Sequence, residues 1–180
     1  KEQLVADKLC EVVRANNHFL DFGLLGSKSV PAMLTRYGYV EDAMKMITKT
    51  EAPSWGYWVE TMGYTTLPET WTLSPQFRDA SLNHVFMGDV SAWMMNQLAG
   101  INYDAAGPGF RHILITPHFV EGMDWAKGEY HSVRGLISSQ WKREGGKVTL
   151  TVTIPSGCTA DIRVGDKTET VGSGTYVNTY

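Results

Sequence analysis

Apolar residues in roughly the first hundred positions recur at the spacing of one helix face. Near the start of the chain these positions are Leu4, Val5, Leu9, Val12 and Val13. The next segment, SKSVPAMLTRYG, predicts a second helix with Ser27 or Ser29 as its N-cap. Pro31 would then lie in the first turn, and Gly38 would end the helix. The pattern therefore predicts antiparallel helix pairs joined by short loops.

Two further segments have helical spacing. They are VEDAMKMITK, at 40–49, and HVFMGDVSAWMMNQLAG, at 84–100. The apolar positions of the second are Phe86, Val90, Trp93, Met94 and Leu98. Gly100 stands at a usual helix C-terminal position. This many apolar helix faces exceeds what four or five helices can cover, so the helical half is expected to be part of something larger.

The period changes to two beyond a cluster of Gly107, Pro108 and Gly109. The segment KVTLTVTIP alternates apolar residues with threonine, as a half-buried strand does. Two hairpins are predicted, turning at Gly145–Gly146 and at Gly165–Asp166. The predicted fold class is α + β in two parts: a helical part over residues 1–104 and an antiparallel β-sandwich over residues 105–180.

Charge and composition exclude several classes of protein. The formal net charge is −3 with no basic run, so nucleic-acid binding has no electrostatic support. No apolar stretch reaches the roughly 18 residues of a membrane span, so no membrane partner is expected. Cys10 and Cys158 stand far apart without metal-type spacing and are read as unpaired thiols. The five histidines form no ligand pair, so no metal and no cofactor are expected.

The loop-like stretch from Gly63 to Gly88 carries the candidate chemistry. It places Glu69 between Pro68 and Thr70, two residues before Trp71, and His84 fifteen residues after Glu69. Pro68 stiffens the backbone, and partial burial beside Trp71 would make the carboxylate a better base. Aromatic faces match the C–H faces of sugars, and carboxylates and imidazoles match their hydroxyls.

Ordinary structural roles compete with this interpretation. The aromatic residues around Trp55 can fill the core between helix ends, Glu69 can be a solvated loop residue, and His84 can cap or pack at a helix start. A glycosidase needs two carboxylates, and the other acids nearby, Glu60, Asp79 and Asp89, form no convincing pair with Glu69 by spacing. The pattern alone thus indicates a possible carbohydrate site on a helical scaffold.

The sequence also resembles a known family. Its segments Gly23 to Gly26, Pro53 to Gly56, Gly63 to Trp71, Ser81 to His84 and Pro108 to Phe110 match, in order and spacing, the C-terminal part of bacterial α-L-rhamnosidases of glycoside hydrolase family 78. The resemblance covers nearly the whole chain. It implies the end of an (α/α)₆ catalytic barrel followed by a C-terminal β-sandwich.

The resemblance implies an inverting glycosidase mechanism. One carboxylic acid protonates the leaving oxygen, while a carboxylate about 6.5–9.5 Å away activates a water on the opposite face of the sugar. The family base matches Glu69. The family histidine that contacts rhamnose matches His84, and Trp55 of the Pro-Ser-Trp-Gly segment is carried over as a further substrate-binding residue. The expected partner is a terminal rhamnoside of a glycan or glycoside.

Three departures from the family pattern matter. Tyr64 replaces alanine and would narrow the pocket, and Pro68 stands where relatives commonly have tryptophan, so sugar preference can differ. The third is that the general acid of the family lies upstream of Lys1. The missing upstream part of the same chain is therefore an expected partner, and this piece alone is expected to be inactive. The compartment cannot be read from the sequence.

Two other functions remain open. One is an (α/α)₆ hydrolase for another deoxy or uronic sugar, in which Glu69 keeps its role. The other is a non-catalytic module in which the sandwich binds sugar or serves a structural role. For that function Trp125, read as a loop residue in EGMDWAKGEY, is the candidate exposed platform, whereas Trp141 is expected in the core.

Overall fold

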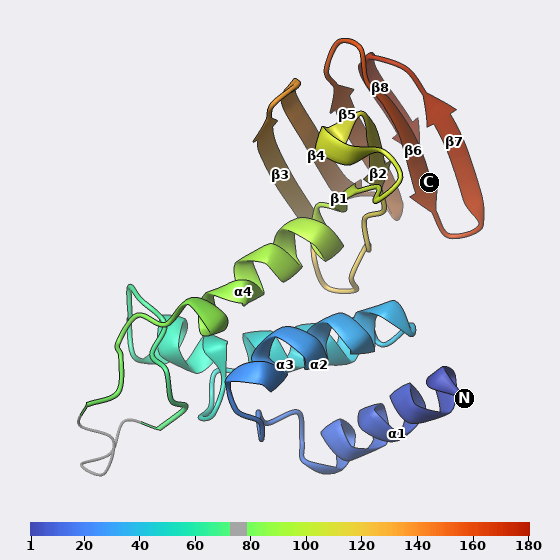
Figure 1. Ribbon diagram of the computed structural model, residues 1–180. Coiled ribbons are helices and arrows are strands. Elements are labelled where there is room, and N and C mark those ends of the chain that lie inside the picture. Colours follow the sequence, from blue (N-terminus) through green and yellow to red (C-terminus); the bar gives the residue numbers. More distant parts are fainter. Residues whose placement is uncertain (73–78) are drawn as a thin grey trace. The chain divides into compact units, whose positions relative to one another are not determined.

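The computed structural model describes residues 1–72 and 79–180. The chain forms two compact units, Lys1–Trp93 and Met94–Tyr180. The first is built from helices and long loops, and the second from two sheets (Figure 1). This confirms the predicted fold class, helices followed by a β-sandwich.

The helices of the first unit surround α2. The elements are α1 (Glu2–Ala15), α2 (Leu24–Arg36), α3 (Val40–Thr48), the π-helix η1 (Tyr57–Thr61) and α4 (Val85–Trp93). Helix α2 contacts α1, α3 and α4. Its Leu34 is fully buried, as is Ala43 of α3, and Thr35 of α2 accepts a hydrogen bond at 3.0 Å from the Trp93 indole of α4. The apolar faces predicted for these segments therefore meet in one core.

The start of α2 differs from the prediction. The helix begins at Leu24 rather than after Ser27 or Ser29, and Pro31 lies inside it. The Ser27 hydroxyl is not an N-cap: it is positioned to donate to the carbonyl oxygens of Leu24 (2.5 Å) and Phe86 (3.0 Å). Gly23 occupies the cap position and has no side chain that could signal a helix start. The extra turn is held by tertiary contact with α4, which local sequence does not encode.

The end of α2 agrees with the prediction. Gly38 adopts a φ of 91°, which favours glycine. Its N–H donates to the carbonyl of Thr35, and the N–H of Tyr39 donates to the carbonyl of Leu34. This pair of bonds is a Schellman motif, which satisfies the last helical carbonyls.

Helix α1 forms where the apolar spacing predicts a helix, but Val13 is the one residue buried among the five apolar positions of that pattern. Leu4 and Val5 are 71% exposed and Val12 is 55% exposed, whereas Ala6, Cys10 and Val13 are buried. Cys10 and Cys158 are free and buried, as expected. Burial raises the pKa of the Cys10 thiol to about 11, so the thiol stays protonated at neutral pH. An apolar stripe on α1 thus faces solvent in this chain.

The second unit contains two four-stranded sheets. One has the order β1-β2-β6-β7 and the other β3-β4-β5-β8. Their strands are β1 (Ile101–Tyr103), β2 (His112–Ile115), β3 (Trp125–Ser132), β4 (Gly135–Glu144), β5 (Lys147–Ile154), β6 (Thr159–Val164), β7 (Lys167–Val171) and β8 (Gly174–Thr179). The π-helix η3 (Met94–Leu98) and the 3₁₀ turn η4 (Pro108–Phe110) complete the unit.

The strand pairing follows the turn signals where they are local. The β4–β5 and β6–β7 hairpins form with the predicted turns. All pairs are antiparallel except β2 with β6, which are parallel and joined by a long excursion through the other sheet. Trp141 is fully buried as predicted, and its indole N–H donates to the Leu98 carbonyl at 2.8 Å. Trp125 is the first residue of β3 rather than a loop residue, and it is 61% exposed.

Candidate functional site

The first part of the candidate site is a loop anchored by Ser54 and Trp55. The Ser54 hydroxyl is positioned to donate to the Lys49 carbonyl and accepts from the Tyr57 backbone N–H, which fixes the entry into η1. Trp55 is only 3% exposed, and its indole N–H donates to the Met87 carbonyl of α4 at 2.9 Å. The segment before η1 is therefore tied to the helix that follows His84.

A cluster of aromatic rings holds the residues around Glu69. Trp71 stacks on Trp58 with ring centroids 4.6 Å apart and meets the edge of Trp55 at 5.0 Å. It also packs edge-on against Phe22 at 5.9 Å, and its indole N–H donates to the Phe22 carbonyl at 2.6 Å. Offset and edge-on ring pairs add directional stability to the burial. Trp71, two residues after Glu69, is thus fixed in place.

Backbone hydrogen bonds bring Glu69 and His84 onto neighbouring segments. The Glu69 N–H donates to the Ser81 carbonyl at 2.8 Å, and the His84 N–H donates to the Leu67 carbonyl at 2.9 Å. The Thr66 hydroxyl adds a third link to the Leu82 carbonyl at 2.7 Å. We call these three bonds the loop ladder. It joins residues 66–69 to residues 81–84, so the base and histidine predicted from sequence share one local framework.

The carboxylate of Glu69 is oriented by the same ladder. Its Oε2 accepts the Ser81 backbone N–H at 3.0 Å. Glu69 is half-buried, while Pro68 just before it is buried. A carboxylate held through one oxygen by a backbone donor has restricted rotation and keeps lone pairs for a second partner. This is the arrangement that a positioned general base requires.

The hydrogen bond that His84 accepts sets which ring nitrogen carries its proton. The ring nitrogen Nδ1 accepts the Phe86 backbone N–H at 3.3 Å, and the Phe86 ring packs edge-on against the imidazole at 5.4 Å. In a neutral imidazole that accepts at Nδ1, the proton resides on Nε2. The half-buried His84 therefore has its Nε2–H as a hydrogen-bond donor, and it lies just before α4 begins.

A small cavity of about 160 Å³ lies in the same region. It is lined by Ala52, Tyr57, Trp58, Met62, Tyr64, Trp71 and Thr72. Tyr64, one of the sequence's departures from the family pattern, is part of its wall. The cavity is mostly aromatic, and Trp71 connects its wall to the peptide that carries Glu69.

The other candidate acids take no part in the three bonds of the loop ladder. Glu60 and Asp79 are exposed, and Asp89 is half-buried on α4. Trp55 is nearly fully covered by its neighbours, so its predicted contact with sugar stays a prediction. Phe22 was not anticipated as part of the region, because it stands 49 residues before its partner Trp71 and no local pattern links the two.

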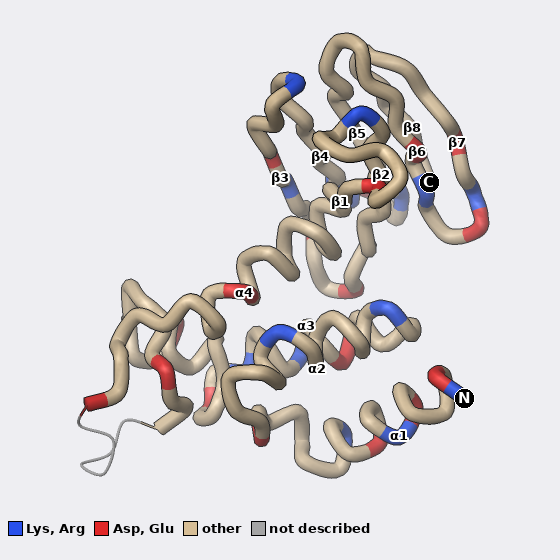
Figure 2. Tube along the Cα trace, in the orientation of Figure 1, with Lys and Arg blue, Asp and Glu red and all other residues tan. Residues whose placement is uncertain are grey.

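Residues 1–72 and 79–180 contain no group of three or more side chains suited to hold a metal ion. None of the helices in these ranges combines the length and apolarity needed to cross a membrane. Figure 2 shows acidic and basic residues interspersed along both units.

Family models and a curated relative both relate this chain to alpha-L-rhamnosidases. Residues 1–98 match a family described as the bacterial alpha-L-rhamnosidase 6 hairpin glycosidase domain, and residues 100–177 match the bacterial alpha-L-rhamnosidase C-terminal domain. A curated alpha-L-rhamnosidase of Streptomyces avermitilis is 31% identical over 163 residues, which cover 87% of this chain and 16% of that protein.

Solved structures of alpha-L-rhamnosidases are also similar to this chain. The S. avermitilis alpha-L-rhamnosidase complexed with L-rhamnose has a TM-score of 0.88 at 27% identity, covering 99% of this chain and 20% of that one. The native enzyme of Aspergillus terreus has a TM-score of 0.91 at 26% identity, covering 98% and 21%. The chain therefore spans about a fifth of the length of these relatives.

Proposed function

Because this chain belongs to the bacterial α-L-rhamnosidase family, we propose that it is the C-terminal part of an enzyme that hydrolyses terminal α-L-rhamnosides. In this proposal the first unit completes the catalytic barrel and the second is its C-terminal β-sandwich. The observation that carries the proposal is the loop ladder, which holds Glu69 and His84 on adjoining segments and aims a backbone donor at the Glu69 carboxylate.

The proposed chemistry is hydrolysis with inversion. Glu69 removes a proton from a water molecule as that water attacks the anomeric carbon of rhamnose. A carboxylic acid from the upstream part of the protein gives its proton to the leaving oxygen, so the C–O bond breaks as the new one forms. The Nε2–H of His84 donates to a sugar hydroxyl. Trp55 contributes mainly by fixing Trp71 and the start of α4.

In this proposal the catalytic groups are shared between this chain and the upstream part of the enzyme, so this chain alone is inactive. It supplies the base and the histidine, while the acid and most stacking tryptophans come from residues before Lys1. Removing general acid catalysis typically costs ~10²–10⁴-fold in rate. The chain therefore needs the upstream part as an intramolecular partner for activity.

The first prediction tests Glu69 in the longer enzyme that contains this chain. We expect Glu69→Gln to lower kcat on an aryl α-L-rhamnoside by at least ~10²–10⁴-fold, because the amide cannot take the proton from water. Glu60→Gln is the matched control, since it makes the same change on an exposed acid of η1, nine residues before Glu69. Retention of wild-type kcat in Glu69→Gln would exclude Glu69 as the base.

The stereochemistry of the product gives a separate check on the mechanism. NMR of the first product should show β-L-rhamnose, since inversion converts the α-glycoside into the β-sugar. An initial α product would instead indicate retention and a nucleophilic carboxylate.

Tyr64 in the cavity wall favours a second candidate substrate class. A bulky phenol at this position can exclude rhamnose in favour of another deoxy or uronic sugar, with Glu69 keeping its role. Comparing aryl glycosides of these sugars with the rhamnoside, in the wild type and in Tyr64→Ala, separates the two. Rhamnoside hydrolysis that dominates in the wild type supports the first class.

A further inference from the structure

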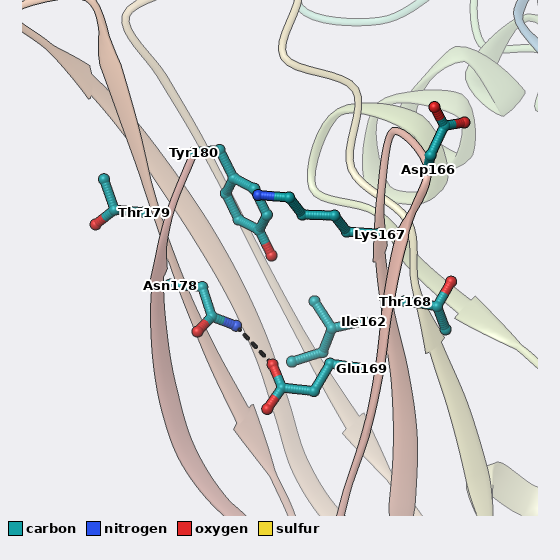
Figure 3. Close-up of a pocket in the computed structure, with 8 residues that line it drawn as sticks. All are labelled: Ile162, Asp166, Lys167, Thr168, Glu169, Asn178, Thr179 and Tyr180. Carbon is teal, nitrogen blue, oxygen red and sulfur yellow. Dashed lines mark hydrogen bonds between the residues drawn. The ribbon is translucent and has the colours of Figure 1, made fainter.

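One side of the second unit is left open by two edge strands. Strand β7 ends the sheet β1-β2-β6-β7, and β8 ends the sheet β3-β4-β5-β8. A groove of about 570 Å³ runs between them, shown in Figure 3. Its walls come from β6, the β6–β7 turn, β7 and β8: Ile162, Asp166, Lys167, Thr168, Glu169, Asn178, Thr179 and Tyr180.

The pairing register shows that the groove occupies space where a sandwich normally has core. Glu169 pairs with Ile162, and Asn178 pairs with Leu150. Residues directly opposite each other in antiparallel strands project to the same face of the sheet. Ile162 and Leu150 are only 2% and 1% exposed, so Glu169 and Asn178 project toward the interior of the sandwich. Inner-face positions are usually apolar and fill the core, and here they are polar.

The polar groups of the groove are arranged around apolar surface. The Asn178 amide donates to Glu169 Oε2 at 3.1 Å, which links the two walls (Figure 3). The Lys167 ammonium lies 5.8 Å from the centre of the Tyr180 ring. Burial raises the pKa of the Tyr180 hydroxyl, so the hydroxyl keeps its proton and its donor capacity at neutral pH. The Tyr180 ring and Ile162 supply the apolar part of the lining.

We propose that this groove binds a neutral saccharide unit, at a site separate from the one that contains Glu69. A sugar offers both a C–H face for the Tyr180 ring and hydroxyls that donate to Glu169 and accept from Asn178 and Lys167. Asp166, Glu169 and Lys167 give the groove lining two negative charges and one positive charge, which disfavours an anionic ligand and leaves Lys167 to offset part of the negative charge. The groove would hold a second part of a long glycan, which goes beyond the proposed hydrolysis.

Polar residues on edge strands have a competing explanation. Inward-pointing charges on edges prevent strands of different molecules from pairing. That role needs the charge of Lys167 and Glu169 but no ligand. The two explanations therefore make opposite predictions for saccharide binding and for self-association.

NMR of the ¹⁵N-labelled 180-residue chain tests the proposal. L-Rhamnose and D-galactose are each added to about 50 mM, which nearly saturates a site with a Kd of about 1 mM. At least one of the two should shift the amide signals of β7 and β8 that surround Glu169 and Asn178. Glu169→Ala and Asn178→Ala should each weaken binding about tenfold or more, because each removes a hydrogen-bonding group.

The controls separate loss of the site from loss of the fold. Val177→Thr changes the residue next to Asn178, but Val177 is 64% exposed and projects to the other face of β8, so binding should be unchanged. The indole signal of Trp141, bonded to Leu98, reports that the sandwich is intact. Glu69→Gln should leave these shifts unaltered, so failure of the hydrolysis proposal does not decide this one.

Two outcomes would overturn the inference. One is no groove shift with either sugar while the Trp141 signal shows a folded sandwich. The other is shifts that persist in both Glu169→Ala and Asn178→Ala. Increased self-association of Glu169→Ala, together with absent binding in the wild type, would assign the groove to edge protection instead.

Discussion

At the scale of single residues, Ser139 is a polar residue buried in the sandwich. It is fully buried at an inner position of β4, and its hydroxyl has no hydrogen-bond partner among the described residues. Leaving a buried polar group unpaired costs about 1–3 kcal/mol. The neighbouring inner positions, Ile137 and Trp141, are apolar and fully buried.

Replacing this hydroxyl should stabilise the sandwich. We predict that Ser139→Ala raises the free energy of unfolding by about 1 kcal/mol, because the desolvation cost disappears and only a small void remains. Urea unfolding followed by tryptophan fluorescence measures the change. Ser138→Ala, next to it on the more accessible face of the strand, is the matched control and should shift the midpoint little. A clear loss of stability in Ser139→Ala would mean that the hydroxyl has a partner.

For the candidate site, the sequence could suggest residues but not the framework that holds them. Glu69 and His84 could be chosen because their residue types and spacing match a chemistry and a family pattern. Their shared framework could not be predicted, because the bonds from Glu69 to Ser81 and from Leu67 to His84 join backbone atoms. Backbone groups are common to every residue, so no sequence pattern marks such bonds.

At the scale of elements, Asp42 joins α1, the loop after it and α3. Its carboxylate accepts two bonds from the Arg14 guanidinium, both 2.8 Å, and lies 2.9 Å from His18 Nε2. The Arg14 bonds, aided by His18, hold the pKa of Asp42 well below its usual range although burial acts in the opposite direction. A bidentate pair of this kind fixes direction as well as distance.

This connection predicts an acid-sensitive contribution to stability. The pKa of Asp42 is lower in the folded than in the unfolded chain, so its contribution is complete above about pH 4 and is lost as the pH falls further toward the folded pKa. We expect Asp42→Asn to destabilise the chain by on the order of 3 kcal/mol at pH 7, and by less at pH 3.

Urea unfolding at the two pH values measures the Asp42 effect. Glu11→Gln removes an exposed partner of Lys8 and serves as the control, with little change in stability at either pH. An Asp42→Asn penalty that is equal at pH 7 and pH 3 would contradict the argument.

Prediction of elements succeeded where the signals were local. The turns at Gly145–Gly146 and Gly165–Asp166, and the end of α2 at Gly38, depend on a few adjacent residues. The start of α2 and the parallel pairing of β2 with β6 depend on contacts between distant segments. The spacing on α1 also did not show that Leu4, Val5 and Val12 are exposed, because a periodic pattern shows that a face is apolar but not which neighbour covers it.

At the scale of the whole molecule, the chain corresponds to only part of its relatives. It spans about a fifth of its relatives' length, and its first 98 residues match a six-hairpin domain. The exposed Leu4, Val5 and Val12 of α1 form an apolar stripe of the kind that another helix usually covers. We therefore expect the remaining hairpins of the domain to pack on this stripe.

Because the chain covers only about a fifth of its relatives' length, a prediction follows for the activity of the isolated chain. We expect this 180-residue chain to show no turnover of an aryl α-L-rhamnoside above the level of its Glu69→Gln variant, because in the proposed mechanism Glu69 is the base and the acid comes from the upstream part of the enzyme. The longer enzyme should hydrolyse the same substrate at a rate at least ~10²-fold higher. Turnover by the isolated chain equal to that of the longer enzyme, and abolished by Glu69→Gln, would refute the missing-acid argument.

The loop ladder also has a consequence for changes in sugar selectivity. Most of its bonds join main-chain atoms, which survive nearly any change of the side chains between them. Exchanging Tyr64 or Pro68 removes none of these bonds, so sugar selectivity can change while Glu69 and His84 keep their places on neighbouring segments. An engineer seeking altered selectivity can randomise those two sites first and leave the ladder untouched.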